Sequence, residues 1–294
     1  MTRIVYVNGR YLPYSEAGIH VEDRGFQFGD SVYEVCEIKD GALIDLTRHC
    51  ARLQRSLREL SIPMPMTEAA LRHVLREVAR RNRVRNGLVY LQVTRGRAPR
   101  DFLFPGTTAE PGLVILSRAI DPAKVAAKAE QGIAVRSTPD MRWARCDLKT
   151  VMLLPAALAK EKARQSAAQE AWFVDEKGYV TEGASSNAWI VRADGYVLTR
   201  PLDHRILGGV TRATLLDVLQ TLQVPVEQRA FTIAEAQAAK EAFVTSASAT
   251  VMPVVSIDGR AVADGRPGAL TVRLRKKFHD LAEITPIDRI LGPA

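Results

Sequence analysis

The sequence predicts a mixed α/β protein built of two domains. Its 294 residues are enough for two hydrophobic cores of ordinary size. Segments with the apolar alternation of strands recur along the whole chain, and segments with helical periodicity separate them. Residues 121–132 show no strand alternation, and Pro122 interrupts what precedes them. We therefore expect an N-terminal domain over residues 1–120, a linker over 121–127 and a C-terminal domain over 128–294.

Turn signals and apolar periodicity define the elements of the first domain. Asn-Gly and Asp-Gly pairs mark tight turns between short strands, and the spacing of leucines marks helices. The expected elements are strands within 3–13 around Asn8-Gly9, strands within 31–46 around Asp40-Gly41, a helix from a Thr47 cap to Pro63, a helix from Thr67, and strands at 87–96 and 112–120.

The second domain is expected to contain four strand-rich segments and three helices. The strand-rich segments are 132–140, 170–183, 187–200 and 241–259, and the helices are 153–164, 211–222 and 270–281. No internal repeat or low-complexity tract interrupts this order. The sequence therefore predicts an α/β architecture throughout.

The net charge of +8 raises the question of nucleic-acid binding. Basic residues are spread along the chain rather than gathered in one tail, which argues against that role. The densest cluster, residues 72–85, is interspersed with apolar residues at helical spacing. This pattern is typical of an amphipathic helix with a solvated basic face. We expect no nucleic-acid partner, and scattered arginines also suit a site for anionic substrates.

Composition predicts a cytoplasmic protein. The first 18 residues lack the basic start and apolar core of a secretory signal, and no window has the apolar length that crosses a bilayer. Three scattered cysteines, Cys36, Cys50 and Cys146, have no CxxC spacing and predict no disulfide framework. We expect reduced, mostly buried thiols, no metal site and no membrane contact.

A lysine that opens an apolar run is the first candidate for chemistry. In "RWARCDLKTVMLL", residues 142–154, Lys149 follows a cluster of charged side chains. A buried lysine whose pKa is lowered by nearby cations can act as a Schiff-base nucleophile. Arg142 and Arg145 are expected to favour the neutral amine, whereas Asp147 opposes them. A solvated helix cap is the alternative interpretation of this lysine.

Three further features suit a flat, phosphorylated ligand. In "YVTEGASSN", Glu182 precedes small residues that permit close approach of a ring, so it could pair with a protonated ring nitrogen. Gly208 and Gly209 precede a helix whose first amides can bind phosphate. Hydroxyl residues in "FVTSASAT" and the guanidinium of Arg52 can add phosphate donors. Taken singly, each feature is more typical of an ordinary turn, hairpin or cap.

Together these segments resemble the fold-type IV pyridoxal-phosphate enzymes, and most closely the D-amino-acid aminotransferases. The motifs that carry the resemblance are "EDRGFQFGDSVYEV" (22–35), "HCARL" (49–53), "LQVTRG" (91–96), "RWARCDLKTVMLL" (142–154), "VTEGASSN" (180–187), "GGVTR" (208–212) and "FVTS" (243–246). Their order and spacing extend the resemblance over nearly the whole chain. It implies a smaller N-terminal α/β domain and a larger C-terminal domain with a pseudo-barrel.

The resemblance implies pyridoxal 5'-phosphate as the cofactor. Lys149 matches the lysine that forms the cofactor aldimine and later moves a proton, and Glu182 matches the acid that pairs with the pyridine nitrogen. The other matching positions are Leu207 against the ring and Arg52, Val210, Thr211, Ser246 and Ala247 around the phosphate. Ala247 replaces a hydroxyl residue common in relatives, so one phosphate hydrogen bond is expected to be missing or to come from Ser248.

Substrate recognition departs from the family pattern at one position. D-amino-acid aminotransferases hold the substrate α-carboxylate with a tyrosine, an arginine and a histidine, and the last two lie on a loop from the partner subunit. Tyr33 and Arg100 match the first two, whereas Phe102 occupies the histidine position and Asp101 adds a negative charge. Loss of one donor is expected to weaken carboxylate binding by roughly 1–3 kcal/mol. Ser186 is a further expected substrate contact.

The resemblance implies a homodimer that transaminates a D-amino acid such as D-alanine with 2-oxoglutarate, with ping-pong kinetics. Three alternatives use the same scaffold, because fold does not determine function. They are a branched-chain L-aminotransferase, an (R)-selective amine transaminase, which the apolar Phe102 favours, and aminodeoxychorismate lyase, against which "RCDLKT" argues. A basic binding module without enzymatic activity is the alternative from another class, and it predicts salt-sensitive nucleic-acid affinity.

Overall fold

The structure, a computed structural model, describes residues 3–106 and 109–288. The chain divides into two compact units that are not contiguous in sequence. The first unit contains the chain up to Pro122, the short segment Leu148–Met152 and the chain from Glu283 onward. The second unit contains Ala123–Asp147 and Leu153–Ala282. The chain therefore leaves the first unit after Pro122 and returns to it twice.

A seven-stranded antiparallel sheet forms the first unit, in the order β16-β4-β3-β5-β6-β1-β2. Its strands are β1 (Ile4–Val7), β2 (Arg10–Pro13), β3 (Ser31–Lys39), β4 (Ala42–Ile44), β5 (Gly87–Thr94), β6 (Gly112–Ala119) and β16 (Ile284–Pro286). The hairpins predicted at Asn8-Gly9 and Asp40-Gly41 are confirmed. All four turn residues have positive φ, the conformation that such tight turns require.

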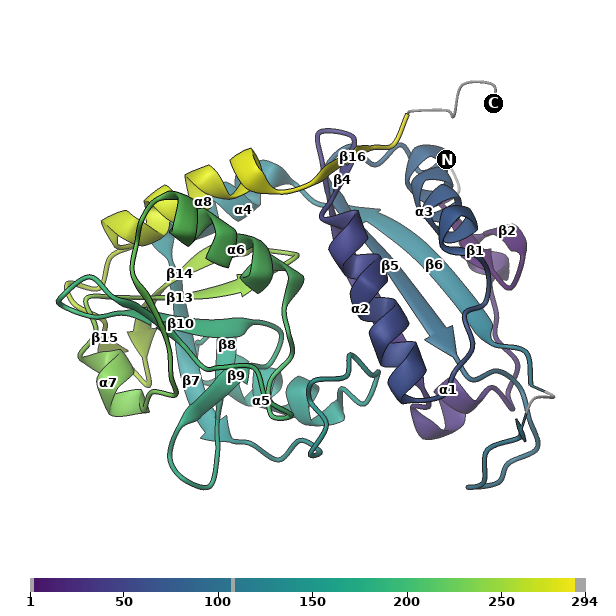
Figure 1. The fold of residues 1–294 in the computed structure, drawn as a ribbon, viewed down its shortest axis with the longest axis horizontal. Helices are drawn as coiled ribbons and strands as arrows, with labels where there is room; N and C mark the ends of the chain where they lie inside the picture. The colour runs from purple at the N-terminus through teal and green to yellow at the C-terminus, as the bar shows by residue number, and fades with distance from the viewer. Residues whose placement is uncertain (1–2, 107–108, 289–294) are drawn as a thin grey trace. The chain divides into compact units, whose positions relative to one another are not determined.

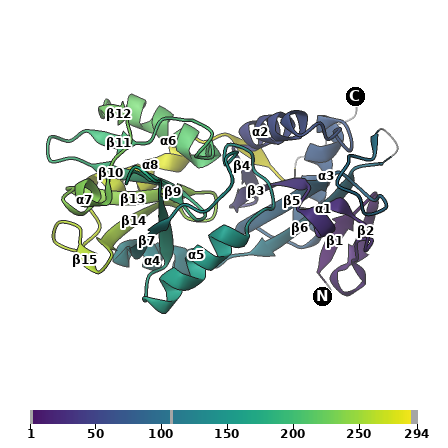
Figure 2. The ribbon, with the colours of Figure 1, turned by 90° about the horizontal axis from the view of Figure 1, so that it is seen from below.

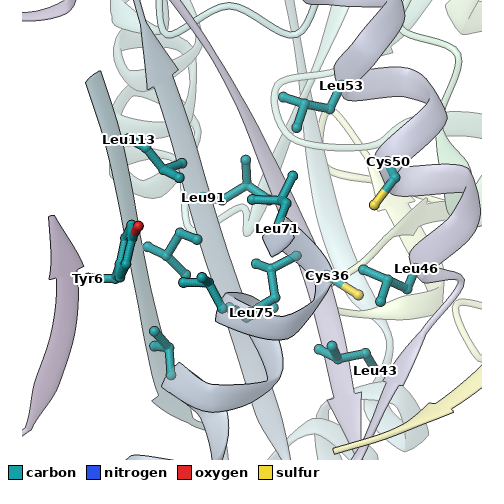
Figure 3. Close-up of a cluster of buried hydrophobic side chains, with 14 of the residues drawn as sticks. Tyr6, Cys36, Leu43, Leu46, Cys50, Leu53, Leu71, Leu75, Leu91 and Leu113 are labelled. Atoms are coloured by element: carbon teal, nitrogen blue, oxygen red, sulfur yellow. The ribbon is translucent and has the colours of Figure 1, made fainter. Parts of the chain in front are cut away.

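Two helices, α2 (Leu46–Glu59) and α3 (Glu68–Arg81), cover one face of this sheet (Figure 1). The helix predicted from the basic cluster is confirmed, because Leu71, Leu75 and three further apolar residues of α3 are buried. These side chains meet Leu53 and Cys50 of α2 and Leu91 of β5 in one core (Figure 3). Two short helical segments, η1 (Tyr14–Glu16) and α1 (Arg24–Phe28), precede β3.

The starts of the two long helices differ in how far local signals define them. Thr67 caps α3 as predicted, because its side chain accepts a hydrogen bond from the Ala70 amide. Thr47, the predicted cap of the preceding helix, lies one residue inside α2, whose N-cap is Asp45. The Thr47 hydroxyl instead donates to the carboxylate of Glu283, 236 residues away. A contact so distant in sequence overrides the local cap signal.

A nine-stranded mixed sheet forms the second unit, in the order β12-β11-β10-β13-β14-β7-β8-β9, with β15 paired to β14. The strands are β7 (Ile133–Pro139), β8 (Glu170–Val174), β9 (Val180–Gly183), β10 (Asn187–Val191), β11 (Val197–Thr199), β12 (Val226–Gln228), β13 (Glu241–Ser246), β14 (Thr250–Ile257) and β15 (Arg260–Ala261). The edge strand β9 also contacts β10, so the sheet curls into a half-barrel. This agrees with the predicted pseudo-barrel.

Helices pack on different strands of the curled sheet (Figure 2). The helices α6 (Val210–Thr221) and α8 (Ala269–Leu281) lie against β13, and α5 (Leu154–Gln165) lies against β7 and β8. All three were predicted from the sequence. The short helix α7 (Ile233–Gln237) was not predicted, and its Thr232–Glu235 capping box is the local signal for it.

The segment treated as a linker is mostly helix. Residues Pro122–Gln131 form α4, with Pro122 at the first helical position, where proline is well tolerated. The expectation of a linker treats Pro122 as the end of the preceding strand, but a proline is equally typical of the start of a helix. Across residues 3–106 and 109–288, no helix combines the length and apolar character needed to cross a membrane. The three cysteines are free and buried.

Candidate active site

The segment that carries Lys149 is bound to the sheet of the first unit. The amide of Tyr33 donates to the carbonyl of Lys149 at 2.9 Å, and the amide of Val151 donates to the carbonyl of Ser31 at 3.2 Å. Val32 and Thr150 form an isolated β-bridge between these two contacts. The segment Leu148–Met152 thus pairs with the beginning of β3, and this pairing fixes the backbone of Lys149.

The Lys149 side chain lies against an aromatic pair. Its Nζ is 4.3 Å from the centroid of the Tyr33 ring, and Tyr33 stacks on Tyr90 at 5.6 Å. Burial, together with the neighbouring Tyr33, raises the pKa of Tyr90 to about 12, so this phenol stays neutral. The structure therefore brings together two of the sequence-predicted site residues, the lysine and the tyrosine.

Arg52 is fixed by a buried carboxylate that the sequence analysis did not identify. Its Nε and Nη2 donate to the two carboxylate oxygens of Glu34, each at 2.7 Å. The Nδ1 of His49 lies 2.6 Å from the same carboxylate. Glu34 is buried in β3 together with Val32 and Cys36, so it occupies the apolar phase of the strand. A glutamate in that phase is the signal that could have identified it.

Ion pairing keeps Glu34 charged despite its burial. Burial raises the pKa of this carboxyl group, but the charge of Arg52 and hydrogen bonds from Arg52 and His49 outweigh burial and lower it from 4.5 to about 2. The carboxylate thus orients the guanidinium of Arg52 at any pH near neutrality. The Arg52 side chain is 11% exposed.

This pair predicts a loss of stability in acid. Because the pKa of Glu34 is lower in the folded state, its contribution is complete above pH 4.5 and is lost as the pH falls toward 2. The contribution is about 3 kcal/mol at neutral pH. We expect the free energy of unfolding, measured with denaturant at pH 6 and pH 3, to fall in the wild type and to fall less in Glu34→Gln. The exposed Glu16→Gln should retain the wild-type pH dependence, and a Glu34→Gln variant that also retained it would contradict this account.

Glu182 is the third residue of β9, and residues of the second unit hold its carboxylate. Its Oε2 accepts from the Nδ2 of Asn187 at 3.0 Å and from the amide of Leu207 at 3.1 Å, and its Oε1 pairs with Arg142. The side chain is buried. A carboxylate held from several sides keeps a fixed orientation. Glu182 and Leu207, both predicted to contact the cofactor, are therefore in direct contact with each other.

The cations expected to act on Lys149 are paired with acids of their own unit. Arg142 binds Asp140 at 2.8 Å and also pairs with Glu182, while Arg145 binds Asp147 at 3.0 Å. Burial lowers the pKa of Arg142, but its bond to Asp140 and the charge of Glu182 raise it overall. The effect of these two arginines on Lys149 stays a prediction. Within its own unit, Arg142 holds the carboxylate of Glu182.

Apart from Arg52 of the first unit, the predicted phosphate donors lie at two places in the second unit. Val210 and Thr211 form the first turn of α6, whose N-cap, Gly209, provides no side-chain cap. A Cβ atom at Gly209 would lie 2.1 Å from Oδ1 of Asn187, so only glycine permits this close packing. Ser246 ends β13, and its hydroxyl lies 3.3 Å from that of Ser248. Ala247 lies between them.

Strand pairing brings two of the motifs together. Asn187 of β10 pairs with Thr245 of β13, which places "VTEGASSN" beside "FVTS". The hydroxyl of Ser186, an expected substrate contact, donates to the buried Glu170 at 3.1 Å. Ser185 donates to the same carboxylate oxygen at 2.8 Å. Glu170 thus organises this turn, a role that no local sequence signal indicated.

Arg100 and Phe102 lie on an exposed loop of the first unit. The Phe102 side chain is 79% exposed and meets Phe28 edge to face at 5.6 Å. The guanidinium carbon of Arg100 is 5.3 Å from the centroid of the same Phe28 ring. The added negative charge of Asp101 has a local role, because its carboxylate accepts the amide of Leu103 at 3.0 Å. No cluster of metal-ligating side chains exists among the residues that the structure describes.

Solved structures of aminotransferases share this arrangement of strands and helices. A branched-chain amino acid aminotransferase from Escherichia coli superposes with a TM-score of 0.89 over 98% of this chain and 100% of that chain. The two sequences are 23% identical, so the comparison establishes the fold alone. The fold is therefore one that aminotransferases have.

Sequence comparison identifies the family. The family described as "Amino-transferase class IV" matches residues 31–257. The D-alanine aminotransferase of Bacillus licheniformis is 40% identical over 94% of this chain and 96% of its own length. That of Staphylococcus haemolyticus is 38% identical over 95% of this chain and 98% of its own length. The chain belongs to the class IV aminotransferases, the fold-type IV enzymes that use pyridoxal 5'-phosphate.

Proposed function

We propose that the protein transfers the amino group of a D-amino acid such as D-alanine to 2-oxoglutarate, giving a 2-oxo acid and D-glutamate. The observation that carries this proposal is the buried, ion-paired carboxylate of Glu182, the group that can pair with a protonated pyridine nitrogen. Similarity to two D-alanine aminotransferases over nearly their whole length supports the choice of a D-amino acid. Two half-reactions at one site give ping-pong kinetics.

The residues of the chain fit pyridoxal 5'-phosphate. Glu182 is a buried carboxylate that Arg142, Asn187 and the amide of Leu207 hold in place, and a carboxylate of this kind suits a protonated ring nitrogen. The first turn of α6 begins at an N-cap that provides no side-chain oxygen, as a phosphate-binding helix start requires. Arg52 is oriented by its bidentate contact with Glu34. A cation, hydroxyls and helix amides are the kinds of donor that suit a phosphate dianion.

Each residue has a distinct part in the proposed reaction. The bound cofactor supplies an electron-withdrawing ring that stabilises negative charge at the substrate Cα. Lys149 provides the amine that binds the cofactor and moves a proton at that carbon. Glu182 keeps the ring nitrogen protonated, and Arg142 holds Glu182 in place. Leu207 would hold the ring. The residues that would hold the phosphate are Arg52, Val210, Thr211, Ser246 and Ala247.

The substrate carboxylate is proposed to bind Tyr33 and Arg100, with Phe102 and Ser186 lining the same site. An (R)-selective amine transaminase is the second candidate, because Phe102 puts an apolar ring where a carboxylate donor is expected. A branched-chain L-aminotransferase and aminodeoxychorismate lyase remain on the same scaffold as further alternatives. These candidates differ in the group attached to the carbon that bears the amine.

One assay discriminates the candidates. Purified holoenzyme is given D-alanine, L-leucine or (R)-phenylethylamine with 2-oxoglutarate, and glutamate formation and its handedness are measured. We expect turnover of D-alanine with formation of D-glutamate. Turnover of L-leucine without D-alanine would assign the branched-chain reaction. Turnover of (R)-phenylethylamine alone would assign the amine transaminase.

Phe102→His is expected to strengthen the binding of D-alanine. The imidazole adds a hydrogen-bond donor for the carboxylate, worth roughly 1–3 kcal/mol, so the KM for D-alanine should fall by about 5- to 140-fold. The matched control is Leu103→His, at a neighbouring position of similar exposure. Steady-state kinetics with both variants test the assignment. An equal effect at the two positions would mean that residue 102 does not face the carboxylate.

We further propose a cytoplasmic homodimer in which the loop around Arg100 reaches the partner subunit's site. Phe102, Leu103 and Phe104 are 79%, 76% and 61% exposed. Phe26, two residues before the Phe28 that contacts Phe102, is 69% exposed. Large apolar side chains gathered on one loop are typical of a surface that another protein covers. Sedimentation or light scattering should give about twice the 32.4 kDa chain mass.

A further inference from the structure

We propose that a buried ionic cluster of Arg24, Asp30 and Arg95 positions the loop of residues 97–106 and thereby sets the affinity for the substrate carboxylate. The second part rests on the proposed function, through the assigned role of Arg100. None of the three residues has a part in the reaction described above. They are positioning residues, and Arg24 and Asp30 belong to the motif "EDRGFQFGD".

The cluster places two guanidinium groups on one carboxylate. The Nε atoms of Arg24 and Arg95 lie 2.9 and 2.7 Å from Oδ2 of Asp30, and Nη2 of Arg95 lies 3.0 Å from Oδ1. Arg24 and Arg95 are only 3% and 5% exposed. Buried charges of this kind are costly unless every donor finds an acceptor. The second guanidinium therefore needs acceptors other than Asp30.

Backbone carbonyls at two places supply those acceptors. Arg95 donates to the carbonyls of Leu60 and Ser61 at 2.8 and 3.0 Å, and so binds the C-terminal end of α2. Arg24 donates from Nη1 to the carbonyls of Asp101 and Leu103, at 2.6 and 3.3 Å. One buried side chain thus binds the loop on both sides of Phe102. The loop is tied to the sheet by charge-assisted hydrogen bonds.

Aromatic rings cover the same cluster. Phe104 of the loop lies over Arg95, with its ring centroid 3.6 Å from the guanidinium carbon, and Phe28 lies over Arg24 at 4.5 Å. Phe28 also contacts Phe102 and Arg100 of the loop. The cluster and Phe28 therefore define where Arg100 sits, although the residues at the tip of the loop are themselves exposed.

The local structure leaves Arg24 little freedom to move. Asp23 caps α1 by accepting the Gly25 amide at 2.8 Å and also accepts the Thr94 hydroxyl at 2.8 Å. A Cβ atom at Gly25 would lie 2.4 Å from the side chain of Thr94, so α1 is packed directly on β5. Arg24 is thus presented to the loop from a fixed backbone. Because Arg24 is fixed, its hydrogen bonds to the loop can hold Arg100 in a defined position.

Arg24→Lys tests the proposal, because a lysine keeps the charge but a single ammonium cannot span Asp30 and both carbonyls. Exposed Arg10→Lys is the matched control. Hydrogen exchange of the holoenzyme should show amides of residues 98–106 exchanging about 10-fold faster in Arg24→Lys, with β3 and β5 unchanged. Unchanged exchange in the loop would overturn the positioning role, and this readout requires no catalytic activity.

A double-mutant cycle tests the link to the substrate. Arg24→Lys alone should raise the KM for D-alanine by about 10-fold with little change in kcat, and it should have no further effect when combined with Arg100→Gln. Additive effects of the two substitutions on KM would contradict the link to Arg100. A loss in kcat as large as the change in KM, together with a lowered thermal midpoint, would show that Arg24 has a merely structural role. If the wild type does not turn over D-alanine, the proposed function fails, while the exchange result still decides whether the cluster holds the loop.

Discussion

Lys149→Ala is expected to abolish transamination, with kcat reduced by at least about 10³-fold. The proposed reaction needs one amine both to bind the cofactor and to move the proton at the substrate Cα. The substitution removes that amine but leaves the backbone contacts of Lys149 with β3 intact, because they use only main-chain atoms. The fold should therefore survive. Steady-state turnover of D-alanine and the visible absorbance of the purified protein measure the two effects.

Lys162→Ala is the matched control for this experiment. Lys162 is exposed on α5, 13 positions further along the chain, and should tolerate the change without loss of rate or absorbance. Circular dichroism of both variants confirms folding. A Lys149→Ala protein that retained wild-type absorbance and turnover would mean that a different lysine binds the cofactor.

Glu182→Gln is expected to lower kcat by on the order of 10²-fold while cofactor binding is retained. An amide has the shape of the carboxylate and can keep accepting from Asn187 and Leu207. It has no charge with which to hold a proton on the ring nitrogen, so negative charge at the substrate Cα is less stabilised. Arg142 keeps Asp140 as a partner, so the buried cation is not left alone.

The exposed Glu176→Gln, on the turn before β9, controls for the loss of one negative charge. Single-turnover kinetics with D-alanine measure the step that Glu182 is proposed to assist, and cofactor titration measures binding. An unchanged single-turnover rate in Glu182→Gln would refute the role of the carboxylate. A variant that lost the cofactor altogether would assign Glu182 a binding role instead.

Elements that depend on local signals could be predicted from the sequence. The strands follow from alternation and from turn residues with positive φ, and α3 follows from a cap at Thr67 and a regular apolar face. The start of α2 could not be predicted in this way, because Glu283 binds Thr47 from the far end of the chain. The helix α4 was overlooked because Pro122 has two meanings, a strand break and a helix start.

The same distinction between local and distant signals holds for the candidate site. The motifs in the sequence identify Lys149, Glu182 and the glycines before α6 as candidate site residues. They do not identify the partners of these residues, because ion pairs form between segments that are distant in sequence. Arg52 and Glu34 are 18 residues apart on different elements, and Arg142 and Glu182 are 40 apart. For this reason the local sequence did not indicate the pairing of Arg142 with Glu182.

The interleaved order of the two units limits where this chain can be cut. A fragment that ends at Pro122 lacks the five residues around Lys149 and the strand β16, which pairs with β4. Its β3 would lose the bridge to Thr150, and its β4 would become an open edge. Splitting the gene at that boundary should give an N-terminal piece that aggregates. A split-protein reporter built on this scaffold would need its break in a surface turn within one unit, such as Gly178.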